Sequence, residues 1–176
     1  STVGITGLTL WPDVLNHPMS FDFEKPFLSP EDFTGKTIRI IGSNITSAMY
    51  DAFGATAIVK ENWDKDVIDG LIQGTELGLA QGFAIPMPAV ATGNVTYYPK
   101  YHVLVANSAS FDRLSDEQQN ILREAAAVIQ KQAIAEHPKE VDAATALCEN
   151  GGTIAMASDE QLAAFARVRI PLHAAE

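Results

Sequence analysis

Hydrophobic and polar positions along this 176-residue chain follow two periods, one typical of strands and one typical of helices. Strands are predicted, from β-branched runs and period-two alternation, at residues 5–10, 37–41, 57–60, 97–107 and 153–156. Helices are predicted, from apolar stripes at helical spacing, at residues 44–53, 64–73, 116–136, 138–150 and 159–168. Pro138 either kinks the long helix or lies in the first turn of the next one. Residues 11–30 contain prolines but no helical period, which predicts a connecting segment. The succession of strand and helix predicts an α/β fold with a mostly parallel sheet flanked by helices and a long helix in the C-terminal half.

Polar residues before three of the predicted helices support their boundaries. Ser43 is a good N-cap, because a serine oxygen can accept a free backbone N–H in the first turn. Ser115 with Gln118, and Ser158 with Gln161, have the spacing of capping boxes. These caps predict that the helices begin at residues 44, 116 and 159.

Composition narrows the class of protein and its partners. With 47% hydrophobic residues, the chain can bury a core, and residues 1–176 are expected to form a single α/β lobe. A net charge of −10 argues against nucleic acid as a partner, because phosphate contacts need clustered Lys and Arg. No apolar run reaches the roughly 20 residues of a membrane helix. Because the chain begins at Ser1 without an initiating Met, we expect a removed leader or an internal piece of a longer protein.

Residues able to hold a metal or act as nucleophiles are sparse. The single cysteine, Cys148, lies in a predicted helix and is expected to be a packed thiol. His17, His102, His137 and His173 are scattered, with no two at metal-ligand spacing. The sequence also contains no nucleophile elbow and no phosphate-binding glycine loop. We therefore predict neither a metal nor a cofactor.

Arg39 is the main candidate for ligand binding. It lies near the end of a predicted parallel strand, before a Gly42-Ser43 turn into a helix, and ligands of open α/β sheets bind at that edge. A guanidinium matches a carboxylate as a planar fork, and the helix start adds free N–H groups and a partial positive charge. Arg39, Gly42 and Ser43 thus predict a carboxylate site. Alternatively, Arg39 pairs with a neighbouring surface Asp or Glu, and the local sequence does not decide between the two.

A second candidate group is the cluster Tyr97-Tyr98-Pro99 together with Asn94 and Thr96. Ligand pockets combine aromatic walls with a few placed polar groups, and these residues offer both. They can equally be strand residues that pack a core, so both interpretations stay open. An enzyme of unknown type would need a nucleophile–base pair or a metal cluster near Arg39, and the sequence offers neither in recognisable form.

Several blocks of this sequence, each short, occur in the order and spacing seen in one family. Residues 29–40 (SPEDFTGKTIRI) resemble the segment S-P-x-D-[LF]-x-G-x-x-[IL]-R-[VI] in receptors of tripartite ATP-independent periplasmic (TRAP) transporters, the DctP-like family. Further blocks that resemble this family are residues 53–55, 70–76, 104–107, 111–119 and 152–165. The resemblance runs from about Leu10 to about Val168, which is nearly the whole chain.

The resemblance implies a periplasmic-binding-protein type II-like fold, in which two α/β lobes close on an organic acid and Arg39 forms the salt bridge to its carboxylate. It implies a periplasmic receptor without catalysis, which delivers its ligand to the membrane subunits of a secondary transporter. Nothing before Ser1 corresponds to the family's first lobe, so the chain is expected to be mainly the second lobe, with the missing first lobe as its partner. A ligand-sensing or interaction domain on the same fold is the alternative.

Two departures from the family pattern affect the predicted site. Asn16 and His17 stand where many members carry Arg before His, and both are predicted to contact the ligand. Leu77 and Gly78 stand where the family usually has Asn after the Glu of its G-x-E block. Both changes remove polar ligand contacts, so the identity of the acid is not carried over from the family.

Overall fold

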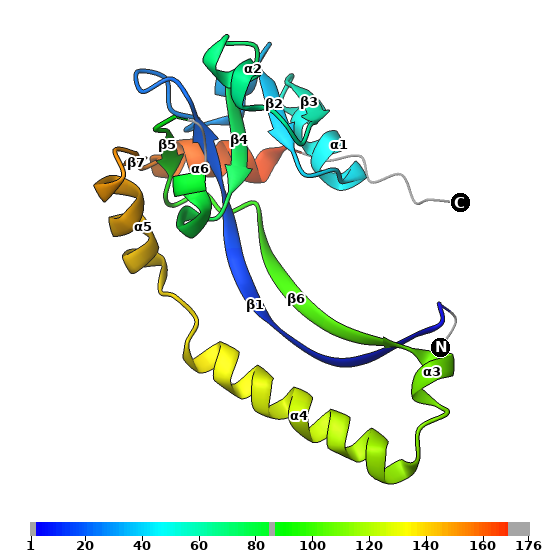
Figure 1. The fold of residues 1–176 in the computed structure, drawn as a ribbon. Coiled ribbons are helices and arrows are strands. Elements are labelled where there is room, and N and C mark those ends of the chain that lie inside the picture. The colour runs from blue at the N-terminus through cyan, green and yellow to red at the C-terminus, as the bar shows by residue number, and fades with distance from the viewer. Residues whose placement is uncertain (1–2, 85–86, 169–176) are drawn as a thin grey trace. The chain divides into compact units, whose positions relative to one another are not determined.

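The computed structural model describes residues 3–84 and 87–168 (Figure 1). The elements are, with η for a 3-10 helix, β1 (Ile5–Ser20), η1 (Pro30–Phe33), β2 (Thr37–Ile40), α1 (Asn44–Ala52), β3 (Thr56–Val59), α2 (Asp64–Ile68), β4 (Gly74–Leu77), η2 (Leu79–Ala84), β5 (Val90–Thr92), β6 (Tyr98–Asn107), α3 (Ser108–Phe111), α4 (Asp116–Ala135), α5 (Glu140–Glu149), β7 (Thr153–Ala155) and α6 (Asp159–Arg167). This mixture confirms the predicted α/β class. None of the helices in the described ranges has both the length and the apolar character needed to cross a membrane.

The strands form one sheet whose order is β3-β2-β4-β1-β5-β7, with β6 also paired to β1. Strand β2 is parallel to β3 and β4, and β5 is parallel to β7. These pairs agree with the predicted parallel arrangement, but β4 and β5 themselves are strands that the sequence analysis does not predict. Strand β1 runs antiparallel to both β4 and β5, which the sequence analysis does not anticipate. The register places Arg39 of β2 between Ile58 of β3 and Thr75 of β4.

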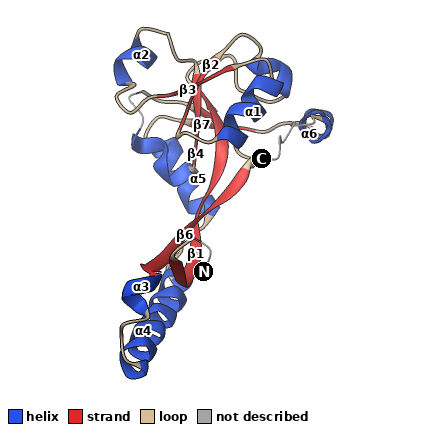
Figure 2. Ribbon diagram, turned by 90° about the vertical axis from the view of Figure 1, so that its right-hand side faces the viewer, coloured by secondary structure: helices blue, strands red, loops and turns tan. Residues whose placement is uncertain are grey.

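The chain divides into two compact units. Unit 1 contains residues 1–14 and 99–139, and unit 2 contains residues 15–98 and 140–176. Strands β1 and β6 therefore each contribute residues to both units, and their course can be followed in Figure 2. The expectation of a single lobe stays a prediction.

Unit 2 has two clusters of buried apolar side chains. One gathers residues from β1, α2, β5 and α5: Met19, Phe21, Trp63, Val67, Ile72, Leu79, Ala89, Ala91, Ala143 and Leu147. The other gathers residues around α1 and η1: Phe27, Phe33, Ile38, Ile40, Met49, Tyr50, Phe53 and Ala55. Because side chains alternate along a strand, Ile38 and Ile40 face the second cluster and Arg39 faces the opposite side of β2.

Unit 1 contains the long helix α4 and the long ends of β1 and β6. Of the α4 side chains, Ala126 alone is buried. Large apolar side chains of this unit are exposed, namely Val103, Leu104 and Val105 of β6 and Ile121, Leu122, Val128, Ile129 and Ile134 of α4. Asp13 of β1 contacts Lys100 and His102 of β6, at 3.1 and 3.2 Å. Unit 1 thus has polar links between its strands and a large apolar surface that it does not bury itself.

The predicted helix starts are confirmed. Ser43 accepts a hydrogen bond from the Thr46 N–H, and both Ser115 and Ser158 form capping boxes. Gly74, in the middle of the sheet, lies at a close approach of the backbone: a Cβ there would be 2.5 Å from the carbonyl oxygen of Met19 and would overlap the Phe27 ring. Only glycine fits between these two groups without movement.

Three expectations are wrong. Residues 11–20 are not a connecting segment, because β1 continues through them to Ser20. Helix α2 ends at Ile68, and Gly70 then adopts a left-handed φ of 72° that no helix continues through. Cys148 is exposed on α5, since the buried face of that helix is formed by Ala143 and Leu147.

Candidate ligand-binding site

Arg39 is half-buried on the face of β2 opposite the second apolar cluster, the one around α1 and η1, which is named the α1 cluster below. Its Nε donates a hydrogen bond to the carbonyl oxygen of Lys60, at 3.2 Å. The guanidinium carbon lies 5.2 Å from the centre of the Trp63 ring, a cation–π geometry. In the described ranges no carboxylate forms an ion pair with Arg39, although its charge acts on Glu76. The two Nη groups are the donors that a carboxylate would bind.

The turn from β2 into α1 is exposed. Gly42 has a left-handed φ of 107°, which favours glycine, and Ser43 caps the helix with its Oγ 3.4 Å from the Thr46 nitrogen. Helix α1 begins within four residues of the end of β2. Its first N–H groups are therefore presented at the same edge of the sheet at which the strand of Arg39 ends.

A buried carboxyl group, that of Glu76, lies on the neighbouring strand β4. Glu76 is 1% exposed. Tyr98 donates a hydrogen bond to Oε1 at 2.6 Å, and Tyr50 donates one to Oε2 at 3.4 Å. Burial raises the pKa of Glu76, and the two phenols and the charge of Arg39 lower it by less than burial raises it. The same burial raises the pKa of Tyr98 to about 12, with the hydrogen bond to Glu76 adding to the effect.

Two buried polar atoms lie near the phenols that hold this carboxyl group. Asn16 is 1% exposed, and neither its Nδ2, which lies beside the Tyr98 phenol, nor the buried Tyr97 hydroxyl, which lies beside that of Tyr50, has a hydrogen bond of acceptable geometry. The backbones of the two residues are joined, because the Tyr97 N–H donates to the Asn16 carbonyl oxygen at 3.0 Å. Unpaired buried polar groups are costly, and they concentrate where a protein binds water or a ligand.

The stability of the protein is expected to fall as pH rises through the raised pKa of Glu76. The folded state binds this proton more tightly than the unfolded state, so the stabilisation is complete below the ordinary pKa of 4.5 and is lost above the folded-state value. The slope is at most about 1.4 kcal/mol per pH unit. Urea unfolding of the wild type and of Glu76→Gln should show this loss in the wild type alone. Equal slopes in both proteins would contradict the prediction, and exposed Glu149→Gln serves as the control.

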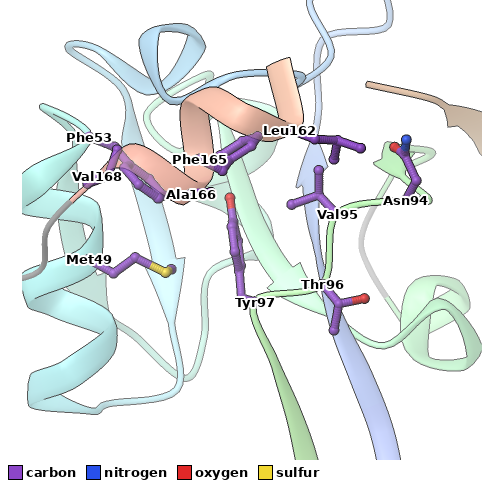
Figure 3. Close-up of a pocket in the computed structure, with 10 residues that line it drawn as sticks. All are labelled: Met49, Phe53, Asn94, Val95, Thr96, Tyr97, Leu162, Phe165, Ala166 and Val168. Atoms are coloured by element: carbon purple, nitrogen blue, oxygen red, sulfur yellow. The ribbon is translucent and has the colours of Figure 1, made fainter. Parts of the chain in front are cut away.

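Asn94, Thr96 and Tyr97 line a cavity of about 350 Å³ together with residues of α1 and α6 (Figure 3). The other lining residues in the described ranges are apolar: Met49, Phe53, Val95, Leu162, Phe165, Ala166 and Val168. Figure 3 shows the Tyr97 hydroxyl pointing toward α6, beside Phe165. The Asn94 amide is already occupied, because it donates to the carbonyl oxygen of Ala157 and accepts from its N–H, both at 2.8 Å. Asn94 therefore holds the start of α6 in place.

His17 is 2% exposed and joins three segments of unit 2. Its Nδ1 lies 2.8 Å from the carbonyl oxygen of Val95, and its Nε2 lies 3.2 Å from Oε2 of Glu140 at the start of α5. Both ring nitrogens are engaged, so His17 positions its neighbours.

The predicted site residues fall into three places. The end of β2 and the turn after it contain Arg39, Gly42 and Ser43. The cavity is lined by Asn94, Thr96 and Tyr97. Strand β1 contains the buried Asn16 and His17. Tyr98 belongs to the second candidate group of the sequence analysis, whereas Glu76, Tyr50 and Trp63 were not included as site residues. Only Glu76 had a sequence signal, since it ends the G-x-E block. His173 lies outside the described residues. Among the described side chains, no cluster of His, Cys, Asp and Glu is able to hold a metal ion.

Comparison with known families gives one match. The model of the family described as bacterial extracellular solute-binding protein, family 7 (DctP), matches residues 1–176. No curated protein matches the chain.

Solved structures similar to this chain include three TRAP periplasmic solute binding proteins. One from Desulfovibrio salexigens with bound orotic acid is 18% identical with a TM-score of 0.77, covering 97% of this chain and 56% of that one. One from Pseudomonas aeruginosa PAO1 with bound L-malate is 22% identical with a TM-score of 0.73, covering 97% and 61%. One from Shewanella oneidensis with bound succinate is 18% identical with a TM-score of 0.76, covering 95% and 56%. The likeness shows a shared fold, and this chain spans little more than half the length of these proteins.

Proposed function

Because this chain belongs to the DctP family, the bacterial extracellular solute-binding proteins of family 7, we propose that it is part of a receptor that binds a small organic acid by its carboxylate. The observation that carries this proposal is the state of Arg39. Its guanidinium is held at the end of a parallel strand by Lys60 and Trp63, and no ion pair in the described ranges occupies it. A fixed, uncompensated guanidinium with two Nη groups to donate is a preorganised carboxylate site.

The ligands in similar structures support this class of solute. The structures named above hold orotic acid, L-malate and succinate, and another, from Rhodoferax ferrireducens, holds malonate. Each of these ligands carries at least one carboxylate. In this chain Arg39 would bind that group, and the first N–H groups of α1, after Gly42 and Ser43, would add donors and a partial positive charge.

The receptor would work outside the cytoplasmic membrane. The similar proteins are periplasmic and of TRAP type, so we place this one in the periplasm as well, where it would deliver its ligand to the membrane subunits of a TRAP transporter. It would act by binding and release, without catalysis. We propose that a first lobe covers the apolar side chains exposed on α4 and β6, since such a surface is typical of an interface. The ligand would then lie between the lobes and stabilise their closed arrangement.

The other predicted contacts have different roles in this proposal. The polar groups of His17 and Asn94 form hydrogen bonds within the protein, so these residues would position their neighbours around the site. Thr96 is exposed and offers its hydroxyl as a further contact. Asn16 stands in place of the arginine that many members of the family carry, and its buried Nδ2 lies beside the Tyr98 phenol.

A thermal-shift panel tests the proposal. The chain alone, and joined to a first lobe, would be heated with orotate, L-malate, succinate and malonate, and with their methyl esters as uncharged controls. A ligand at 100 times its Kd stabilises the folded state by about 2.7 kcal/mol, so a bound acid raises the melting temperature. We expect the acids to act and the esters not to. Stabilisation by esters and acids alike, or by neither in the joined form, would refute a carboxylate receptor.

A further inference from the structure

We propose that the cavity between α1 and α6 is a second binding site, which takes an uncharged molecule of the size of a substituted benzene that carries a hydrogen-bond acceptor. This inference goes beyond the proposed function and does not depend on it, because it concerns a different place and a different class of ligand. All the residues that line the cavity in the described ranges belong to unit 2.

The cavity has the size of a small-molecule pocket and lies apart from the Arg39 guanidinium. Its volume of about 350 Å³ is at the lower end of the range for ligand pockets, roughly 300–1,000 Å³. Met49 and Phe53 form part of its wall, and both belong to the α1 cluster. Arg39 faces the opposite side of β2 from that cluster, because side chains alternate along a strand. A carboxylate bound to Arg39 therefore leaves the cavity open to another molecule.

The walls of the cavity favour an uncharged ligand with an aromatic ring. In the described ranges none of its lining residues is Lys, Arg, His, Asp or Glu, so a charged ligand would lose its hydration without gaining a partner. Part of the wall is aromatic, and the ring centres of Phe53 and Tyr97 lie 5.6 and 6.2 Å from that of Phe165. Aromatic rings prefer offset or edge-to-face contacts with centres about 4.5–7 Å apart. A ligand ring would extend this cluster by such contacts.

Of the polar groups that line the cavity in the described ranges, the Tyr97 hydroxyl is the one left for a ligand. The Asn94 amide is bonded to Ala157 by both its donor and its acceptor, and Thr96 is exposed. The Tyr97 hydroxyl is buried and lies beside that of Tyr50, but it has no hydrogen bond of acceptable geometry. A buried tyrosine hydroxyl usually has a partner. A carbonyl or ether oxygen of a bound molecule would accept this O–H.

Helix α6 forms another wall of the cavity and is held by few contacts. Its Leu162 and Phe165 line the cavity, and none of the α6 side chains is buried (Figure 3). The two hydrogen bonds between Asn94 and Ala157 fix the chain just before the helix. Elements with few buried contacts are the ones that open most easily. A ligand would therefore enter by a movement of α6 about this fixed point.

The test is a titration of acetophenone with the complete protein, followed by ligand-detected NMR, with cumene as the matched probe. The two probes have the same number of non-hydrogen atoms, but only acetophenone carries an acceptor. We expect acetophenone to bind with a Kd of about 1 mM or below. Tyr97→Phe should weaken acetophenone binding about 2- to 12-fold and leave cumene binding unchanged. Leu162→Trp should fill the cavity and abolish the binding of both probes. Ala163→Trp, at an exposed position of α6 outside the cavity, should behave as the wild type.

Arg39→Ala separates the two sites. Acetophenone should bind this variant with the wild-type Kd, and malonate should not displace acetophenone from the wild type. This inference would be overturned by no binding of acetophenone, by an equal acetophenone Kd in Tyr97→Phe, or by equal binding in the two tryptophan variants. Acetophenone binding that weakens as the protein concentration rises would mean that a second copy of the chain fills the cavity, and would overturn it as well. If acetophenone binds as expected and malonate does not bind at all, the proposed function alone fails.

Discussion

Replacing Arg39 with alanine is expected to weaken the binding of a small carboxylate by about 100-fold or more. Each hydrogen bond to a charged partner contributes about 1.5–3 kcal/mol, and a bidentate guanidinium would lose two of them. Arg39→Lys keeps the charge but not the planar fork, so it should recover only part of the affinity. Calorimetric titration of the wild type and both variants with the same acid measures these losses.

The matched control for this substitution is Arg113→Ala. Arg113 is exposed in unit 1, where its Nη2 donates to the Ser110 hydroxyl at 3.2 Å, and its loss removes the same charge from the chain. Binding by Arg113→Ala should equal that of the wild type. Arg39→Ala also loses the contacts with Lys60 and Trp63, so its melting temperature without ligand must be compared first. A well-folded Arg39→Ala that keeps its affinity would rule out Arg39 as the carboxylate site.

Replacing Phe33 with alanine is expected to lower the free energy of unfolding by about 3–5 kcal/mol. Phe33 is 0% exposed and is stacked on Phe27, with their ring centres 4.2 Å apart. Its ring also contacts Tyr50 and Phe53, at 5.6 and 5.3 Å between centres. Removing it would leave a cavity at the centre of the α1 cluster, and such a cavity costs more than the loss of apolar burial alone.

Phe23→Ala is the control, because it removes the same side chain at a position that is 45% exposed. Chemical denaturation of the two variants under identical conditions gives the comparison. The Phe23 variant should lose less than about 1 kcal/mol. If both variants lose the same amount, the aromatic cluster does not stabilise unit 2 as its packing implies.

The parts of the fold that the sequence predicts well are those set by local interactions. Ser43, Ser115 and Ser158 satisfy backbone N–H groups within one turn, so their spacing alone identifies three helix starts. Strand β1 was not predicted at its full length, because its last five residues, from Asn16 to Ser20, are all buried. A strand buried on both sides shows no period-two alternation, and Pro18 hid the pattern further.

The candidate site depends on contacts between distant parts of the chain. Tyr98 reaches Glu76 across 22 positions, and Phe165 of α6 packs beside Tyr97, with ring centres 6.2 Å apart. A single sequence does not encode such neighbours in a local pattern. Arg39 could be chosen as a candidate because a strand end, a glycine turn and a helix start are adjacent in the chain.

Gly74 and Glu76 together limit how this protein can diversify over evolution. Any larger residue at position 74 would collide with Met19 and Phe27, and a charged group at position 76 must be enclosed by phenols or change its ionisation. A change in the solute that the protein binds would therefore have to come from substitutions at other positions. The amino-acid sequences of proteins descended from this one should therefore differ more at the exposed turn of Gly42 and Ser43 than in this short stretch of β4.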